Sequence, residues 1–153
     1  MRFQRANYLV SNKERALLLY RDILGMNLDF MKVSEEDSYS YDVFDIDDSI
    51  PIEFALLSYE NQPRVMALTI LGDGNLEKNP LPRRSAICIE VNDVDETVTK
   101  CTENGFHCYR EDHLITHDGR EGKEVGILDD DGNLIVTTIP VIEIGRASCR
   151  ERV

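Results

Sequence analysis

The sequence predicts an α+β fold made of one βαβββ module used twice. Residues 10–25 and 91–105 both follow a β-type run, and both contain a polar corner, an amphipathic helix pattern and a final glycine. The two copies lie about 80 residues apart, and three β-type segments follow each of them. We therefore expect a single domain over residues 1–142, with modules at about 4–71 and 85–140 and a linker at 72–84.

The first module is expected to begin with a strand at residues 5–10, where β-forming residues alternate. Asn12 can cap the helix that follows, and Gly25 can end it in a left-handed conformation. The acidic segment 34–49 is expected to form a short helix over the domain. Further strands are expected at residues 27–33, 52–57 and 65–71, with 58–64 as a connecting segment.

The second module repeats this plan with clearer signals. Asp93 and Glu96 have the spacing of a capping box, and Gly105 is expected to end the helix. The run DDDGN at 129–133 is expected to be a hairpin turn, because Gly and Asn tolerate positive φ. Residues 112–122 are expected to form a mobile lid loop. Strands are expected at residues 86–91, 106–110, 124–128 and 134–139.

Composition limits the functional classes. The chain has 153 residues and a net charge of −12, which argues against nucleic-acid binding because phosphate contacts need clustered Lys and Arg. No apolar run is long enough to span a membrane, and no secretory signal is visible, so we expect a cytoplasmic protein. The final residues 143–153 resemble translated sequencing-adapter DNA, and we expect them to be a non-native tail.

Outside that tail the chain contains three cysteines, at positions 88, 101 and 108. Their number is odd and no two have C-x-x-C spacing. Reduced thiols that behave as small apolar side chains are therefore expected.

Three segments in order resemble the vicinal oxygen chelate superfamily of glyoxalases, extradiol dioxygenases, and fosfomycin and bleomycin resistance proteins. They are VSNKERALLLYRDILGMNL, which combines a strand end with a helix, then IEVNDVDETV, and finally EVGILDDDGNLIV with its hairpin. The resemblance covers residues 4–140. It implies paired βαβββ modules whose curved mixed sheets form a ligand-binding cleft, commonly in a homodimer.

The resemblance also implies four positions for ligands of a divalent metal, normally His, Glu or Gln. These positions correspond to Arg5 on the first strand, to Ala86 and Val136 in the second module, and to residues 66–69 on the fourth strand. Arginine stays protonated, and alanine and valine have no donor atom. Residues 66–69 contain no carboxylate or imidazole. We therefore expect no metal cofactor of the usual kind.

The same reasoning gives candidates for ligand binding in the cleft. Arg5 would suit a carboxylate or phosphate of a ligand, or it would pair with Glu90 and close the pocket. Glu90 and Glu53 would bind a cationic group or act as a base if they faced the cleft. No catalytic residue can be assigned. The candidate ligand-binding residues are Arg5, Asn7, Met66, Leu68, Ala86, Cys88, Glu90 and Val136.

Three functions remain open. The first is a metal-free protein that binds a small organic molecule. The second is a lactoylglutathione lyase-like enzyme, an isomerase or a dioxygenase with a non-standard metal site, for which Glu53, Glu90 and the imidazoles of His107, His113 and His117 are the available donors. The third is a structural partner without a ligand, whose cleft is filled by its own side chains, for example Met31, Phe44 and Met66.

Overall fold

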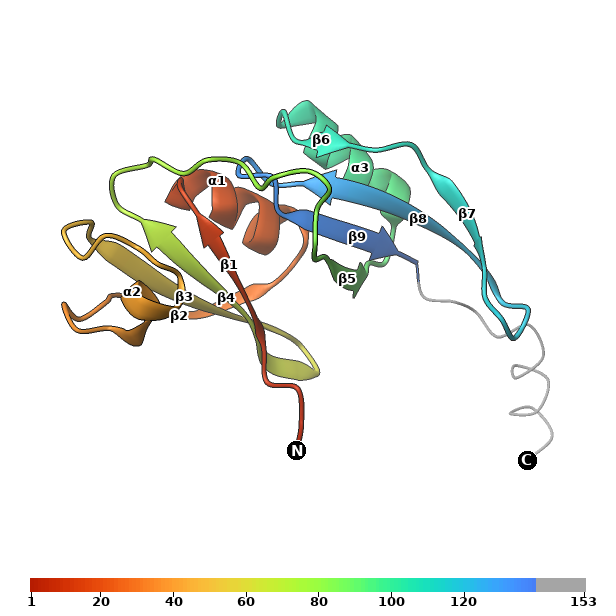
Figure 1. Ribbon diagram of the computed structural model, residues 1–153. Coiled ribbons are helices and arrows are strands. Elements are labelled where there is room, and N and C mark those ends of the chain that lie inside the picture. The colour runs from red at the N-terminus through yellow and green to blue at the C-terminus, as the bar shows by residue number, and fades with distance from the viewer. Residues whose placement is uncertain (140–153) are drawn as a thin grey trace. The chain divides into compact units, whose positions relative to one another are not determined.

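The computed structural model describes residues 1–139 and divides into two compact units (Figure 1). Unit 1 consists of residues 1–84 and 129–133, and the described part of unit 2 consists of residues 85–128 and 134–139. Each unit contains one mixed sheet and one main helix in the order of a βαβββ module. The α+β fold with two such modules is confirmed. The expected tail at 143–153 lies outside the described residues.

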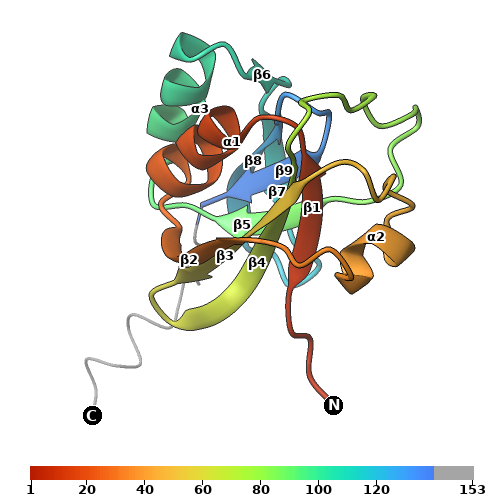
Figure 2. The same ribbon diagram turned by 90° about the vertical axis from the view of Figure 1, so that its left-hand side faces the viewer.

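Unit 1 contains a four-stranded sheet of order β1-β4-β3-β2 (Figure 2). Strand β1 (Ala6–Val10) runs parallel to β4 (Gln62–Leu71), and β3 (Ile52–Tyr59) is antiparallel to both β4 and β2 (Asn27–Val33). The sequence predicted a connecting segment at 58–64. Instead β3 and β4 are longer than predicted, and Tyr59 pairs with Gln62 across a tight turn.

The helix between β1 and β2 begins as predicted. The Asn12 side chain accepts a hydrogen bond from the backbone N–H of Arg15 at 3.0 Å. Helix α1 (Lys13–Leu17) then widens into the π-helix η1 (Leu18–Ile23), which the sequence pattern did not predict. Gly25 ends it with a φ of 79°. The short helix expected in residues 34–49 is present as α2 (Tyr39–Val43).

Unit 2 contains a five-stranded sheet whose main order is β5-β9-β8-β6. Its strands are β5 (Ile87–Glu90), β9 (Leu134–Thr138), β8 (Glu121–Leu128), β6 (His107–Cys108) and β7 (Asp112–Ile115), which pairs with β8. Strands β5 and β9 are parallel, and the other pairs are antiparallel. Helix α3 (Val94–Glu103) has its predicted cap, because Asp93 Oδ1 accepts from the backbone N–H of Glu96 at 2.9 Å.

The prediction of a mobile loop at 112–122 was wrong. Strand β7 (Asp112–Ile115) pairs antiparallel with the first half of β8 and forms a hairpin with it (Figure 1). The hairpin closes where Thr116 N–H donates to the carbonyl of Arg120 at 2.8 Å, and Gly119 takes a φ of 81°. The β-type run HLI is only three residues long and is flanked by charged and turn-forming residues, so the sequence pattern did not indicate a strand there.

The apolar core of each unit lies between its sheet and its helix. In unit 1 the largest fully buried side chains include Tyr20, Leu57 and Leu68, and in unit 2 they include Ile127 and Ile135. Among the described residues, no helix is long and apolar enough to cross a membrane.

Candidate functional site

One face of the unit 1 sheet is directed toward helix α1, and strand register shows which side chains lie on that face and which lie on the opposite one. Lys13 at the start of α1 forms an ion pair with Glu53 at 3.0 Å, so Glu53 points to the α1 side. By register, Glu53 lies opposite Ile70, which lies opposite Val10. Because side chains alternate along a strand, Asn7 must point to the face opposite α1. Thr69 lies on that same face and donates to Asn7 Oδ1 at 3.1 Å.

Register also separates the residues predicted on β4. Met66 and Leu68 are in phase with Ile70 and therefore face α1, where they are 2% and 0% exposed. They are core residues of unit 1 and do not share a face with Asn7. Arg5, another predicted residue, lies directly before β1 and is half-buried. It has no ion-pair or hydrogen-bond partner within residues 1–139.

The second sheet holds the other predicted residues on one face. Lys123 of β8 forms an ion pair with Asp95 of α3 at 2.9 Å, which identifies the α3 side of the sheet. The in-phase residues Val125, Ile127, Ile135 and Thr137 are buried there. The face opposite α3 carries Cys88 and Glu90 of β5 and Val136 of β9. Cys88 and Glu90 are exposed and Val136 is half-buried. Ala86 is exposed and directly precedes β5.

An aromatic pair that sequence reasoning did not assign lies on this face opposite α3. Tyr109 N–H donates to the carbonyl of Gly126 at 2.8 Å, and the Tyr109 ring lies over Gly126. A Cβ at that glycine would be 3.1 Å from Tyr109 Cδ2, so the absence of a side chain makes room for the ring. The His107 ring packs edge-on against Tyr109, with 4.7 Å between the ring centroids. The only sequence signal was one glycine inside a strand pattern.

The residues at the implied metal positions do not fit a metal. Arg5, Ala86 and Val136 offer no lone pair to a divalent cation. On β4, the residues on the Asn7 face are Ala67 and Thr69, and the Thr69 hydroxyl is already bonded to Asn7. Within residues 1–139, no three His, Cys, Asp or Glu side chains are grouped as a metal site requires.

The turn at 129–133 has a role in unit 1 beyond joining β8 to β9. Asp129 is buried and accepts four hydrogen bonds: from the Tyr20 hydroxyl at 2.8 Å, from the backbone N–H groups of Asp131 and Asn133, and from the Asn133 amide. The Ser11 hydroxyl and backbone N–H donate to Asp131. Burial raises the pKa of Asp129 above its ordinary value, although these hydrogen bonds act in the opposite direction.

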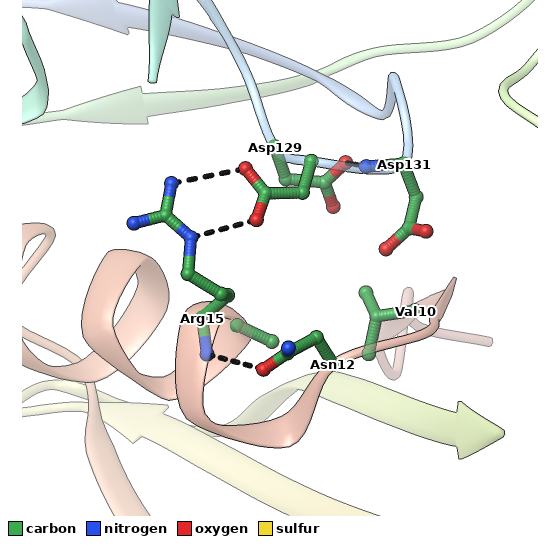
Figure 3. A pocket seen from close by; sticks show the side chains of 7 residues that line it. Val10, Asn12, Arg15, Asp129 and Asp131 are labelled. Carbon is green, nitrogen blue, oxygen red and sulfur yellow. Dashed lines mark hydrogen bonds and ion pairs between the residues drawn. The ribbon is translucent and has the colours of Figure 1, made fainter. Parts of the chain in front are cut away.

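A shallow hollow with no room for a water molecule lies between this turn and the start of α1 (Figure 3). Its polar lining is paired internally. Arg15 forms a two-pronged ion pair with Asp130, with its nearest contact at 2.7 Å, and the Arg15 backbone N–H is bonded by Asn12. These groups need no ligand to satisfy them, so the hollow is a packing feature of unit 1.

Comparisons with known proteins agree with this architecture. The model of the Glyoxalase/Bleomycin resistance protein/Dioxygenase superfamily matches residues 2–137. A search of curated proteins found no match. Among solved structures, a glyoxalase family protein from Bacillus cereus has a TM-score of 0.70 at 16% identity, over 93% of this chain and 95% of that one.

Two other solved structures differ in what they bind. The trypanothione-dependent glyoxalase I of Leishmania major has a TM-score of 0.63 at 20% identity, over 99% of this chain and 94% of that one. TnmS3, an antibiotic binding protein from Streptomyces sp. CB03234, has a TM-score of 0.57 at 16% identity, over 92% and 96%. At these identities the likenesses show the fold alone. The family match over residues 2–137 goes further: this chain belongs to the glyoxalase/bleomycin resistance protein/dioxygenase superfamily.

Proposed function

We propose that this chain is a small-molecule-binding member of its superfamily that works without the divalent metal of the glyoxalases and dioxygenases. The observation that carries the proposal is the chemistry at the implied ligand positions. Arg5, Ala86 and Val136 stand where the family resemblance implies metal ligands, and none of them can donate an electron pair to a metal.

The surface chemistry of unit 2 supports binding. The face opposite α3 combines an exposed thiol at Cys88, an aliphatic side chain at Val136 and the aromatic ring of Tyr109. A small set of polar groups around an apolar surface is typical of sites for organic ligands. TnmS3 is a relative by fold that binds an antibiotic, which fits a binding role for this architecture.

In unit 1, Arg5 supports the proposal by a separate route. Its guanidinium has no bonded partner among residues 1–139, and it directly precedes the strand that carries Asn7. An unpaired, half-buried guanidinium suits an oxygen-rich group of a ligand, because its planar donors match such groups.

Two measurements on one preparation test the proposal. The chain is purified without chelator or affinity metal, and its metal content is determined by elemental mass spectrometry. We expect less than about a tenth of an equivalent of Zn, Ni, Mn or Fe, and no thermal stabilisation when these ions are added. A thermal-shift screen with native mass spectrometry then covers aromatic, cationic and thiol-conjugate compounds. We expect saturable stabilisation by at least one class.

The control is a variant with Val136→Arg, which places a bulky positive charge on the face opposite α3 without touching the buried α3 side. It should keep the melting behaviour of the parent and lose the ligand response. Stoichiometric metal that survives dialysis would contradict the metal-free proposal. A screen without any response would contradict the binding role.

A further inference from the structure

The face opposite α3 carries an acidic row across three strands of unit 2. Strand register aligns Glu90 of β5 with Thr138 of β9, and Thr138 with Glu124 of β8. Neighbouring strands lie about 4.8 Å apart, so the backbones at the two glutamates are about 10 Å apart on either side of Thr138. A charged group above Thr138 would therefore lie within reach of both carboxylates.

Within residues 1–139, no lysine or arginine pairs directly with these two glutamates. Neither Glu90 nor Glu124 has an ion pair or a hydrogen bond to its side chain within residues 1–139. The nearby lysine on β8, Lys123, points to the α3 side and is held by Asp95 and Glu111 at 2.9 and 3.2 Å. The strands of unit 2 place no Lys or Arg on the face opposite α3. Asp112 of β7 lies opposite Glu124 and extends the row, and Arg110 pairs with Asp112 at 3.0 Å. The charges of Arg110 and Asp112 offset each other, so the row keeps the net negative charge of Glu90 and Glu124.

The next row of the same face is apolar and aromatic. Cys88 lies opposite Val136, which lies opposite Gly126 with the Tyr109 ring above it. The His107 ring packs against the Tyr109 ring in a T-shaped arrangement. A flat apolar body placed on this row would bring a positive group on one side of it to the glutamates, and the Tyr109 ring would add a favourable cation–π contact.

We propose that the face opposite α3 binds an organic cation with a flat apolar body. This inference rests on the proposed binding function and names its ligand class. Charge complementarity selects the cation, since an anion would meet two unpaired carboxylates and a neutral molecule would leave them unused. The aromatic row selects an organic ligand over a metal ion.

The test uses three probes of one shape: the cation 1-methylquinolinium, the neutral 1-methylnaphthalene and the anion 1-naphthoate. Affinity for the full chain is measured by ligand-observed NMR titration at low salt. We expect the cation to bind at least about ten-fold more tightly than the neutral probe, because its bound positive group would lie well within a Debye length of both carboxylates. Added salt at 0.5 M should reduce that preference, since the glutamates are in contact with solvent.

Matched variants locate the effect. Glu90→Gln with Glu124→Gln should bring the cation to within about two-fold of the neutral probe. Glu60→Gln with Glu103→Gln removes the same charge from a turn and from the end of α3, and it should leave the cation preference intact. Tyr109→Leu should weaken the cation and the neutral probe together. Circular dichroism confirms that each variant is folded.

The outcomes separate the two proposals. Equal affinity for all three probes would overturn the cation inference and leave the proposed binding function standing. Binding of none of them would overturn the inference, and the wider screen described above would then decide the binding function on its own. A cation preference that the Glu90 and Glu124 exchanges do not reduce would also overturn the inference.

Discussion

Replacing Asp129 by alanine is expected to lower the free energy of unfolding by about 3–5 kcal/mol. The exchange removes the acceptor of four hydrogen bonds at once. The Tyr20 hydroxyl is then left inside the core, where its side chain is 0% exposed, and each unsatisfied buried donor costs about 1–3 kcal/mol. The measurement is urea unfolding followed by circular dichroism.

Two further variants show that the effect comes from the buried acceptor. Asp129→Asn keeps the size and one acceptor oxygen, so its loss should be intermediate. Arg15→Ala removes the partly exposed ion pair with Asp130 at the same turn, and it should cost less than about 1 kcal/mol. If Asp129→Ala and Arg15→Ala lower the free energy of unfolding by the same amount, the buried acceptor at Asp129 does not stabilise the fold more than the partly exposed ion pair does.

Much of the fold was predictable because the signals are local. The Asn12 and Asp93 caps and the stop at Gly25 depend on side-chain chemistry within a few residues, and the structure confirms all three. The capping signal does not depend on what happens farther along the helix. The π-helix η1 could not be predicted, because no single residue of the sequence specifies its widened backbone.

The candidate site was less predictable because it depends on register. Residues 66–69 are all buried, so their sequence has no polar alternation that reveals which side chains share a face. Only the pairing of β4 with β1 assigns Met66 and Leu68 to the α1 side and Thr69 to the Asn7 side. In unit 2 the strands alternate in burial, and there Cys88, Glu90 and Val136 do share one face.

The bonds of the 129–133 turn were unpredictable for a different reason. The DDDGN pattern identified a turn, but Tyr20 and Asp129 are 109 residues apart in the chain. A tyrosine at a helix-core position is most simply read as apolar packing, and its hydroxyl partner becomes visible only in three dimensions. Because Asp129 lies beside the buried Tyr20 hydroxyl, the ionisation of Tyr20 is expected to affect the stability of the folded chain.

The chain is expected to lose stability steeply at alkaline pH. Burial, reinforced by the Asp129 carboxylate, raises the pKa of Tyr20 well above its ordinary value near 10. Burial also raises the pKa of Cys101 and that of Tyr59, each to about 12. All three groups keep their protons in the folded state at pH values where the unfolded chain releases them.

The direction of the effect follows from the proton count. Above the ordinary pKa values the folded state binds more protons than the unfolded state, so the free energy of unfolding falls as pH rises. Each group contributes at most about 1.4 kcal/mol per pH unit. The slope should begin near pH 8.5 with Cys101 and approach about 3–4 kcal/mol per unit above pH 10, with the partly exposed Tyr59 contributing less than its full share.

Urea unfolding at pH 8, 9, 10 and 11 measures this slope. Tyr20→Phe removes one titrating group and leaves the aromatic packing, so its stability should fall less steeply than that of the parent above pH 10. Lysines that titrate in the same range contribute equally to both proteins and cancel in the difference. The packing loss in the variant shifts the whole curve, whereas a buried Tyr20 proton changes its slope. Parallel curves up to pH 11 would show that the Tyr20 hydroxyl is not held in the core by Asp129.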